Sequence, residues 1–208
     1  MKYKIFERKL SFTKKTDCPE LIEFIETYIQ DPHGNSIELT NIQKELLGSI
    51  NNNQFNIITK PRQVGATSAM IGYIVKDIIF SIGVGSKKTI NITSTKQESA
   101  SEIIHKVSDI LFNIGFTPTS SSQKKLTYNG GLIKLLATGP NIESLLGYHP
   151  DHIYFDEFSF MNNLNLLLSN AMMSLNTGGK INLISSLGGV NTLESVTDEY
   201  GMFNVVEL

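Results

Sequence analysis

From Phe55 onward, short apolar runs alternate with longer segments of helical periodicity, and this alternation limits the fold more than any other feature. The first run, FNIIT, is followed by the loop KPRQVGAT and a helical segment to about Ile82. The run KTINITS at 88–94 and a periodic segment at 98–114 repeat the unit. Alternating strands and helices are typical of a mostly parallel sheet covered on both faces. We therefore expect a three-layer α/β fold.

The segments on either side extend this pattern. The turn NGG at 129–131, between the apolar runs 126–128 and 132–137, predicts a β-hairpin, either as an insertion or at a sheet edge. Beyond it, we expect a strand at 152–155, a helix at 164–175, a strand at 181–185 and a last strand near the C-terminus. Residues 19–30 predict a short amphipathic helix, and Thr40 or Asn41 is expected to cap a second one. With 208 residues, the chain is long enough for one well-packed domain.

Composition excludes several classes of protein. Hydrophobic residues at 40% and charged residues at 18% are typical of an ordered globular chain. The single cysteine, Cys18, excludes an intramolecular disulfide and a cysteine-rich metal site. The longest apolar stretch, 69–84, contains Lys76 and Asp77, which is a poor pattern for a membrane span. We therefore expect no membrane partner.

The net charge of −2 excludes a protein that binds nucleic acid mainly through a strong positive charge. The charges are unevenly distributed, with 17 basic and 12 acidic residues up to Pro140 and one basic and eight acidic residues after it. Two explanations remain open: chance clustering of solvated charges, or a polar surface that assembles head to tail.

The loop from Lys60 to Thr67 connects an expected strand to a helix N-terminus, where backbone N–H groups and the helix dipole favour a phosphate. Gly65 would allow close approach of the backbone, Thr67 could ligate magnesium, and Lys60 could reach the β- and γ-phosphates. The usual pattern GxxxxGK[ST] is not matched, because Lys60 stands at the first glycine and Ala66 at the lysine. An ordinary strand–helix connection remains the alternative for this loop taken alone.

Two adjacent carboxylates, Asp156 and Glu157, follow the apolar run HIYF. Phosphoryl transfer to water needs one group that holds magnesium and another that orients or deprotonates the water. We assign the first role, through water, to Asp156 and the second to Glu157, with an ordinary acidic strand end as the alternative. A phosphate loop, a DE-ended strand and intervening strand–helix units in this order together favour an NTP hydrolase.

In these segments the chain resembles the amino-terminal ATPase domain of the large terminase subunit of tailed bacteriophages. The segment 18–50 resembles that family's entry helix and adenine-binding Gln motif, and FNIITKPRQVGAT resembles its variant Walker A motif. LTYNGGLIKLLATGPNIESLLGYHPDHIYFDEFSF resembles its hairpin, connecting loop and Walker B motif, and INLISSLGG its coupling motif. The resemblance covers most of the chain and implies a P-loop NTPase fold of the RecA-like (ASCE) type.

The resemblance also implies residue roles. Gln43 would contact the adenine edge, Lys60 would replace the lysine missing at Ala66, and Arg62 would sense or polarise the γ-phosphate. Ser185 and Ser186 would relay hydrolysis to movement. The residues expected to be catalytic are Glu157, Arg62 and Lys60, and those expected to hold Mg²⁺ are Thr67 and Asp156. The residues expected to bind ATP are Gln43, Lys60, Pro61, Arg62, Gln63, Val64, Gly65, Ala66, Thr67 and Ser68.

The chain departs from the family pattern at several positions. Leu146 stands where many relatives carry an arginine before the loop glycine, and Leu187 where they usually have proline. Arg8 and Arg62 are the only arginines in the sequence, so a finger from an identical subunit would be one of these two, unless a lysine or another protein takes the role. The RNase H-like nuclease domain that usually follows is not in this sequence, so we expect DNA cleavage from a separate domain or chain.

Taken as a whole, the resemblance implies a Mg²⁺-dependent ATPase core at 51–208, preceded at 1–50 by a basic arm and a helical entry segment with the Gln motif. It would power translocation of double-stranded DNA into a procapsid, as a homo-oligomeric ring with the portal and the small terminase subunit as partners, although the isolated chain could be a monomer. It would act in the cytoplasm of the infected bacterial host, at the procapsid portal, and be absent from the mature virion. The alternatives are another nucleic-acid translocase, or a degenerate, regulatory relative that binds nucleotide without turnover.

Overall fold

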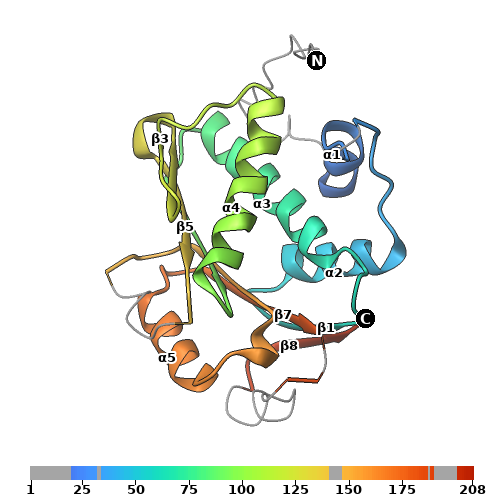
Figure 1. Ribbon diagram of the computed structural model, residues 1–208, viewed down its shortest axis with the longest axis vertical. Helices are drawn as coiled ribbons and strands as arrows, with labels where there is room; N and C mark the ends of the chain where they lie inside the picture. The colour runs from blue at the N-terminus through green and yellow to red at the C-terminus, as the bar shows by residue number, and fades with distance from the viewer. Residues whose placement is uncertain (1–19, 32–33, 141–146, 187, 190–200) are drawn as a thin grey trace.

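A computed structural model describes residues 20–31, 34–140, 147–186, 188–189 and 201–208. Its centre is an eight-stranded sheet with the strand order β3-β4-β5-β2-β6-β7-β1-β8. Helices cover both faces of the sheet, so the expected three-layer α/β fold is confirmed (Figure 1). The strands are β1 Phe55–Lys60, β2 Lys88–Ser94, β3 Ser120–Ser121, β4 Lys125–Tyr128, β5 Ile133–Thr138, β6 His152–Asp156, β7 Lys180–Ser186 and β8 Asn204–Glu207.

The helices agree with the periodic segments of the sequence to within a few residues at each end. They are α1 Leu21–Tyr28, α2 Asn41–Asn52, α3 Ala66–Gly83, α4 Gln97–Asn113 and α5 Leu164–Ser174, with short 3₁₀ helices η2 Asn129–Gly131 and η4 Phe158–Phe160. The expected hairpin is formed by β4 and β5 and lies toward one edge of the sheet. The two-residue strand β3, outside β4, was not expected.

The strands β1, β2, β5, β6, β7 and β8 run parallel to one another. Their carboxyl ends therefore meet at the same edge, which is where open α/β sheets bind ligands. Lys60, Asp156 and Ser186 are the last residues of β1, β6 and β7, which are neighbours in the sheet.

A row of asparagines crosses β8, β1 and β7 at one register position. Asn56 donates to Asn182 Oδ1 at 2.8 Å, and Asn204 donates to Asn56 Oδ1 at 3.4 Å. Asn56 and Asn182 are fully buried, so the bond between them favours this alignment over a shifted one, because a slip would leave its donor and acceptor without partners. The same register places Lys60 beside Ser186.

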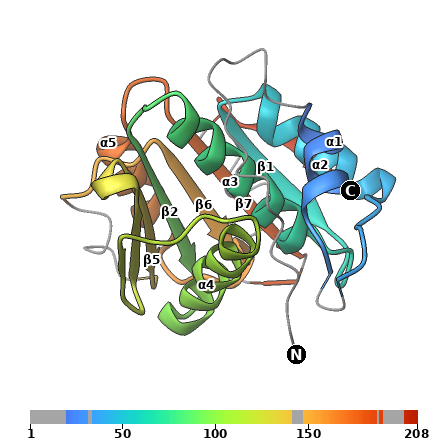
Figure 2. The same cartoon turned by 90° about the horizontal axis from the view of Figure 1, so that it is seen from above.

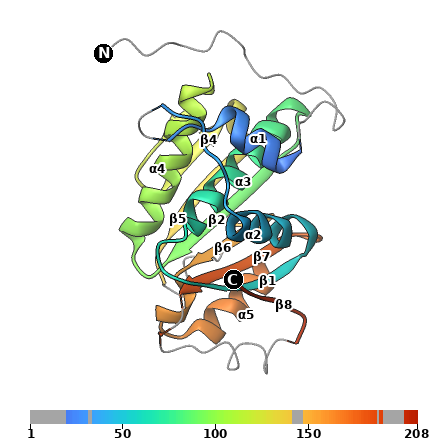
Figure 3. The ribbon, with the colours of Figure 1, turned by 90° about the vertical axis from the view of Figure 1, so that its right-hand side faces the viewer.

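Each face of the sheet has its own apolar core. Helices α1 to α4 pack over one face with the larger cluster, and α5 covers the other with the smaller one. Figure 2 and Figure 3 show α3 and α4 side by side over the sheet, with α1 and α2 next to α3. Among the described residues, α3 alone is long and apolar enough to cross a membrane, and 61% of that stretch is buried inside the protein, as expected for a core helix.

Some expectations concern residues outside the described ranges. These are the basic arm with Arg8, which lies within residues 1–19, the position of Leu146 and that of Leu187.

Candidate active site

The loop between β1 and α3 has the backbone shape of an anion-binding turn. Gln63 has a φ of 63° and Gly65 a φ of 74°, both left-handed, and α3 begins directly after Gly65. The N–H groups in the first turn of a helix have no acceptor within the helix, so they are free to bind a ligand. Thr67 and Ser68 lie in this first turn.

Where a P-loop usually has its lysine, this chain has Ala66, which packs in the apolar core. Ala66 is 2% exposed and belongs to the larger apolar core. Among the described residues that line the adjoining cavity, Lys60 alone carries an ammonium group, and its side chain is 7% exposed. The Nζ of Lys60 lies 3.0 Å from Oε1 of Glu157, which neutralises a charge that would otherwise be costly to bury.

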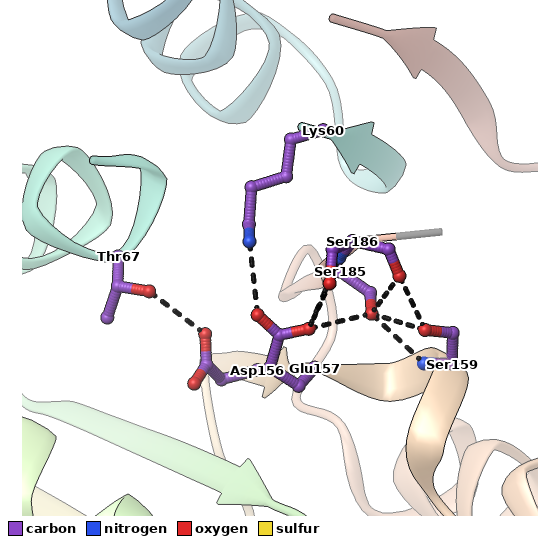
Figure 4. A network of polar contacts seen from close by, with 7 residues as sticks. All are labelled: Lys60, Thr67, Asp156, Glu157, Ser159, Ser185 and Ser186. Carbon is purple, nitrogen blue, oxygen red and sulfur yellow. Dashed lines mark hydrogen bonds and ion pairs between the residues drawn. The ribbon is translucent and has the colours of Figure 1, made fainter. Parts of the chain in front are cut away.

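Glu157 turns the chain at the end of β6. Its φ of 58° and ψ of 46° are left-handed, which is rare for a residue with a side chain and re-aims the carboxylate. Strand geometry would send Asp156 and Glu157 to opposite faces. With this turn, Asp156 reaches α3 while Glu157 reaches β1 and β7 (Figure 4).

The second oxygen of Glu157 is held by β7. Oε2 accepts hydrogen bonds from Ser185 Oγ at 3.1 Å, Ser186 Oγ at 3.1 Å and the Ser186 backbone N–H at 3.2 Å. Burial raises the pKa of Glu157, but the hydrogen bonds and charge of Lys60 and the Ser186 bonds outweigh it and leave the pKa below its usual value. Glu157 is therefore a fixed, ionised carboxylate.

Asp156 lies in a different environment. It is 9% exposed, and Thr67 Oγ1 donates to its Oδ1 at 3.3 Å. Burial, followed by the negative charge of Glu157, raises the pKa of Asp156 to about 6. A nearby cation would stabilise the ionised form of such a carboxylate.

Asp156 and Thr67 fit Mg²⁺ by their chemistry, since this ion takes a few protein oxygens and completes its shell with water and phosphate. No group of three or more His, Cys, Asp or Glu side chains gathers within the described part of the chain. A magnesium ion held by Asp156 and Thr67 would take its remaining ligands from water and a bound phosphate.

Gln43 lies against the phosphate loop. Thr40 and Gln43 form a capping box at the start of α2, in which Gln43 Oε1 accepts from the Thr40 N–H at 2.9 Å. Gln43 Nε2 donates to the Gly65 carbonyl at 3.4 Å. A Cβ at Gly65 would overlap that nitrogen, so the close approach requires glycine.

A cavity of about 300 Å³ opens beside these residues. Its lining consists of Lys60, Arg62, Gln63, Thr95, Glu157, Phe160 and Ser186. The structure thus brings Arg62 and Ser186 to the same space as the Lys60–Glu157 pair. Sequence reasoning did not identify Thr95, although it follows β2 at the carboxyl edge, or Phe160, which follows the DE pair.

No protein-family model and no curated protein matches this chain. Solved structures do match. The large terminase of a thermophilic bacteriophage, in complex with ADP, aligns with a TM-score of 0.62 at 15% identity over 81% of this chain and 44% of that one. The large terminase of bacteriophage HK97 aligns with a TM-score of 0.66 at 15% identity over 90% of this chain and 43% of that one. The large terminase ATPase domain of Thermus phage P74-26 aligns with a TM-score of 0.56 at 13% identity over 82% of this chain and 86% of that one.

The fold is that of a phage large-terminase ATPase domain. The expected RecA-like P-loop class is thereby confirmed, with a mostly parallel sheet flanked by helices. The chain spans less than half the length of the first two large terminases, but most of the length of the P74-26 ATPase domain.

Proposed function

We propose that this protein is the Mg²⁺-dependent ATPase motor domain of a terminase large subunit. The observation that carries the proposal is the meeting of Lys60 and Glu157 at 3.0 Å, between the phosphate loop and the DE-ended strand, beside a cavity of about 300 Å³. An ammonium and an ionised carboxylate at one cavity are the two groups that phosphate binding and water activation require.

The residues divide the work of hydrolysis among them. The N–H groups from Val64 to Ser68 would bind phosphate oxygens, and Pro61 and Gln63 would complete the loop that surrounds them. Lys60 and Arg62 would stabilise the charge that develops on the transferred phosphoryl group. Gln43 would hold the loop and read adenine.

Thr67 and Asp156 would hold Mg²⁺, which when bound neutralises phosphate charge and orients the phosphates. Glu157 would accept the proton of the attacking water, and its low pKa keeps it ionised at neutral pH. An incoming triphosphate would compete for Lys60 and loosen its bond to Oε1 of Glu157, which frees that oxygen for water.

The motor role rests on the fold likeness. Ser185 and Ser186, which hold Glu157, would relay the state of the site to β7 as coupling residues. In this proposal residues 51–208 form the core and residues 1–50 the entry segment. The work would be translocation of double-stranded DNA into a procapsid, by a ring on the portal in the infected host's cytoplasm, with the small terminase subunit and a separate nuclease as partners.

One observation favours a second candidate, a nucleotide-binding relative without turnover. Glu157 uses both carboxylate oxygens within the protein, one on Lys60 and the other on β7. A site that kept this arrangement with nucleotide bound would have no base to offer water.

Replacement of the base separates the two candidates. Glu157→Ala should keep ATP binding, measured by calorimetry, and lose Mg²⁺-dependent turnover by about a hundredfold or more, since a positioned base contributes at least that much. Glu207→Ala, in the exposed end of β8, is the control and should behave as the unmodified protein. Equal turnover in Glu157→Ala and the unmodified protein would contradict the assignment.

A further inference from the structure

The hydrogen-bond network around Glu157 continues to a residue with no role so far, Ser159. It lies in η4, two residues after Glu157, and is 3% exposed. Its Oγ lies 2.5 Å from Ser185 Oγ and 2.7 Å from the Ser186 carbonyl oxygen, and its backbone N–H donates to Ser185 Oγ at 3.3 Å. Ser159 thus contacts both serines that hold the catalytic carboxylate (Figure 4).

The direction in which the Ser185 hydroxyl points decides whether it donates a hydrogen bond to the carboxylate of Glu157. Ser185 Oγ has three acceptors within reach, Glu157 Oε2 at 3.1 Å, the Ser186 carbonyl at 3.0 Å and Ser159 Oγ at 2.5 Å, but one proton to give. Either hydroxyl can be the donor in the 2.5 Å contact, and when Ser159 donates to Ser185 Oγ, the Ser185 proton stays available for another acceptor. The carboxylate of Glu157 is then the favoured acceptor, because the bond to it is charge-assisted.

The position of Ser159 is fixed by its neighbour Phe158, which is 1% exposed and packs in the core beneath α5. Phe160 on the other side lines the cavity and is exposed. Ser185 is fully buried and Ser159 is 3% exposed, so water does not compete for these hydroxyl groups. A short element anchored by a buried aromatic side chain holds a hydroxyl group more accurately than a free loop would.

We propose that Ser159 is a positioning residue for hydrolysis, which acts through Ser185 to aim the carboxylate of Glu157 at the attacking water. The inference rests on the proposed ATPase function.

Steady-state kinetics with the full chain, MgATP and double-stranded DNA test the proposal. Ser159→Ala should lower kcat by about 10- to 100-fold, the usual effect of a misplaced catalytic group, with a KM for ATP within about twofold of the unmodified value. Ser159→Thr, which keeps the hydroxyl group, should recover most of the lost kcat. The matched control is Ser174→Ala, a buried serine whose hydroxyl bonds within its own helix to the Ala171 carbonyl; its kcat should not change.

A double-mutant cycle separates positioning from packing. If Ser159 acts through Ser185, the double variant Ser159→Ala/Ser185→Ala should be no slower than Ser185→Ala alone. Multiplied losses, or a raised KM with unchanged kcat, would overturn the inference. So would full activity of Ser159→Ala in a protein that hydrolyses ATP, and this result would leave the proposed function standing. No hydrolysis by the unmodified chain would overturn both.

Discussion

At the scale of single residues, the candidate site is built around the ammonium group of Lys60. Lys60 ends a buried strand and reaches Glu157 across the cavity mouth, whereas Ala66 is packed in the core. A lysine at the start of the loop thus lines the cavity, and its charge is balanced by the carboxylate of Glu157. In the proposed function this lysine binds phosphate.

Lys60→Ala should weaken ATP binding by about 10- to 100-fold, the effect of losing a hydrogen bond to a charged group, and should abolish turnover. Lys87→Ala is the control, because Lys87 is exposed and precedes β2 at the opposite edge of the sheet. Unchanged ATP affinity and rate in Lys60→Ala, measured by calorimetry and phosphate release, would transfer the role to another lysine.

The sequence predicted a candidate site residue where both the residue type and its place at a strand end or loop suited the chemistry. Lys60, Thr67, Asp156 and Glu157 follow from a loop and a strand end, and the structure brings them to one edge of the sheet. Ser159 and Thr95 were not found, because a single serine or threonine next to a motif has no periodicity or charge that distinguishes it.

At the scale of elements, the phosphate loop depends on one glycine. Gly65 and Gly85 have similar left-handed φ values, 74° and 67°, but a Cβ at Gly85 would meet nothing within 4 Å. Gly65→Ala and Gly85→Ala should each lose about 1 to 2 kcal/mol of stability in thermal unfolding, the cost of a left-handed alanine. Only Gly65→Ala should also displace Gln43 and weaken ATP binding. Equal ATP affinity in the two variants would contradict the close approach of Gln43 to the loop.

A partly buried polar cluster of Asp77, Lys88 and His152 holds α3 to the amino ends of β2 and β6. Asp77 Oδ1 lies 3.3 Å from Lys88 Nζ, and Oδ2 lies 3.2 Å from His152 Nδ1. Burial raises the pKa of Asp77, but His152 and then Lys88 together outweigh burial and leave it below its usual value. Because the folded-state pKa lies below the unfolded one, the stabilisation is complete above the ordinary aspartate pKa of about 3.9 and is lost as the pH falls through the folded-state pKa.

Asp77→Asn should therefore lower the free energy of unfolding at pH 7 by about 2 kcal/mol, measured by urea unfolding. The difference from the unmodified protein should shrink below about pH 4. Asp109→Asn, in the exposed face of α4, should change stability by less than about 0.5 kcal/mol at either pH. A difference that stays constant with pH would exclude the ion pair as its source.

Elements were predictable where periodicity was strong. The segment of α4 has apolar residues at helical spacing and that of β2 alternates between apolar and polar residues, while α3 is apolar over most of its length; the structure confirms all three elements. The strand β3 consists of two exposed serines, so hydrophobic patterning gives no sign of it. The left-handed turn at Glu157 is also a tertiary effect, since glutamate has no local preference for it.

At the scale of the whole molecule, the fold explains why distant segments form one site. Parallel strands from residues 55–60, 152–156 and 180–186 end together, so a loop, a carboxylate pair and a serine pair far apart in sequence become neighbours. The order of the motifs in the sequence predicted that the site lies at the carboxyl edge of the sheet. It did not predict which side chains from different strands would contact one another there.

The proposed function requires that this arrangement of residues hydrolyses ATP with Mg²⁺. The most direct measurement is steady-state phosphate release by the purified chain at high concentration with double-stranded DNA, in Mg²⁺ and in EDTA. We predict turnover in Mg²⁺ that EDTA abolishes. Absence of phosphate release in Mg²⁺ would contradict it, and ATP binding without release would favour the relative that binds nucleotide without turnover.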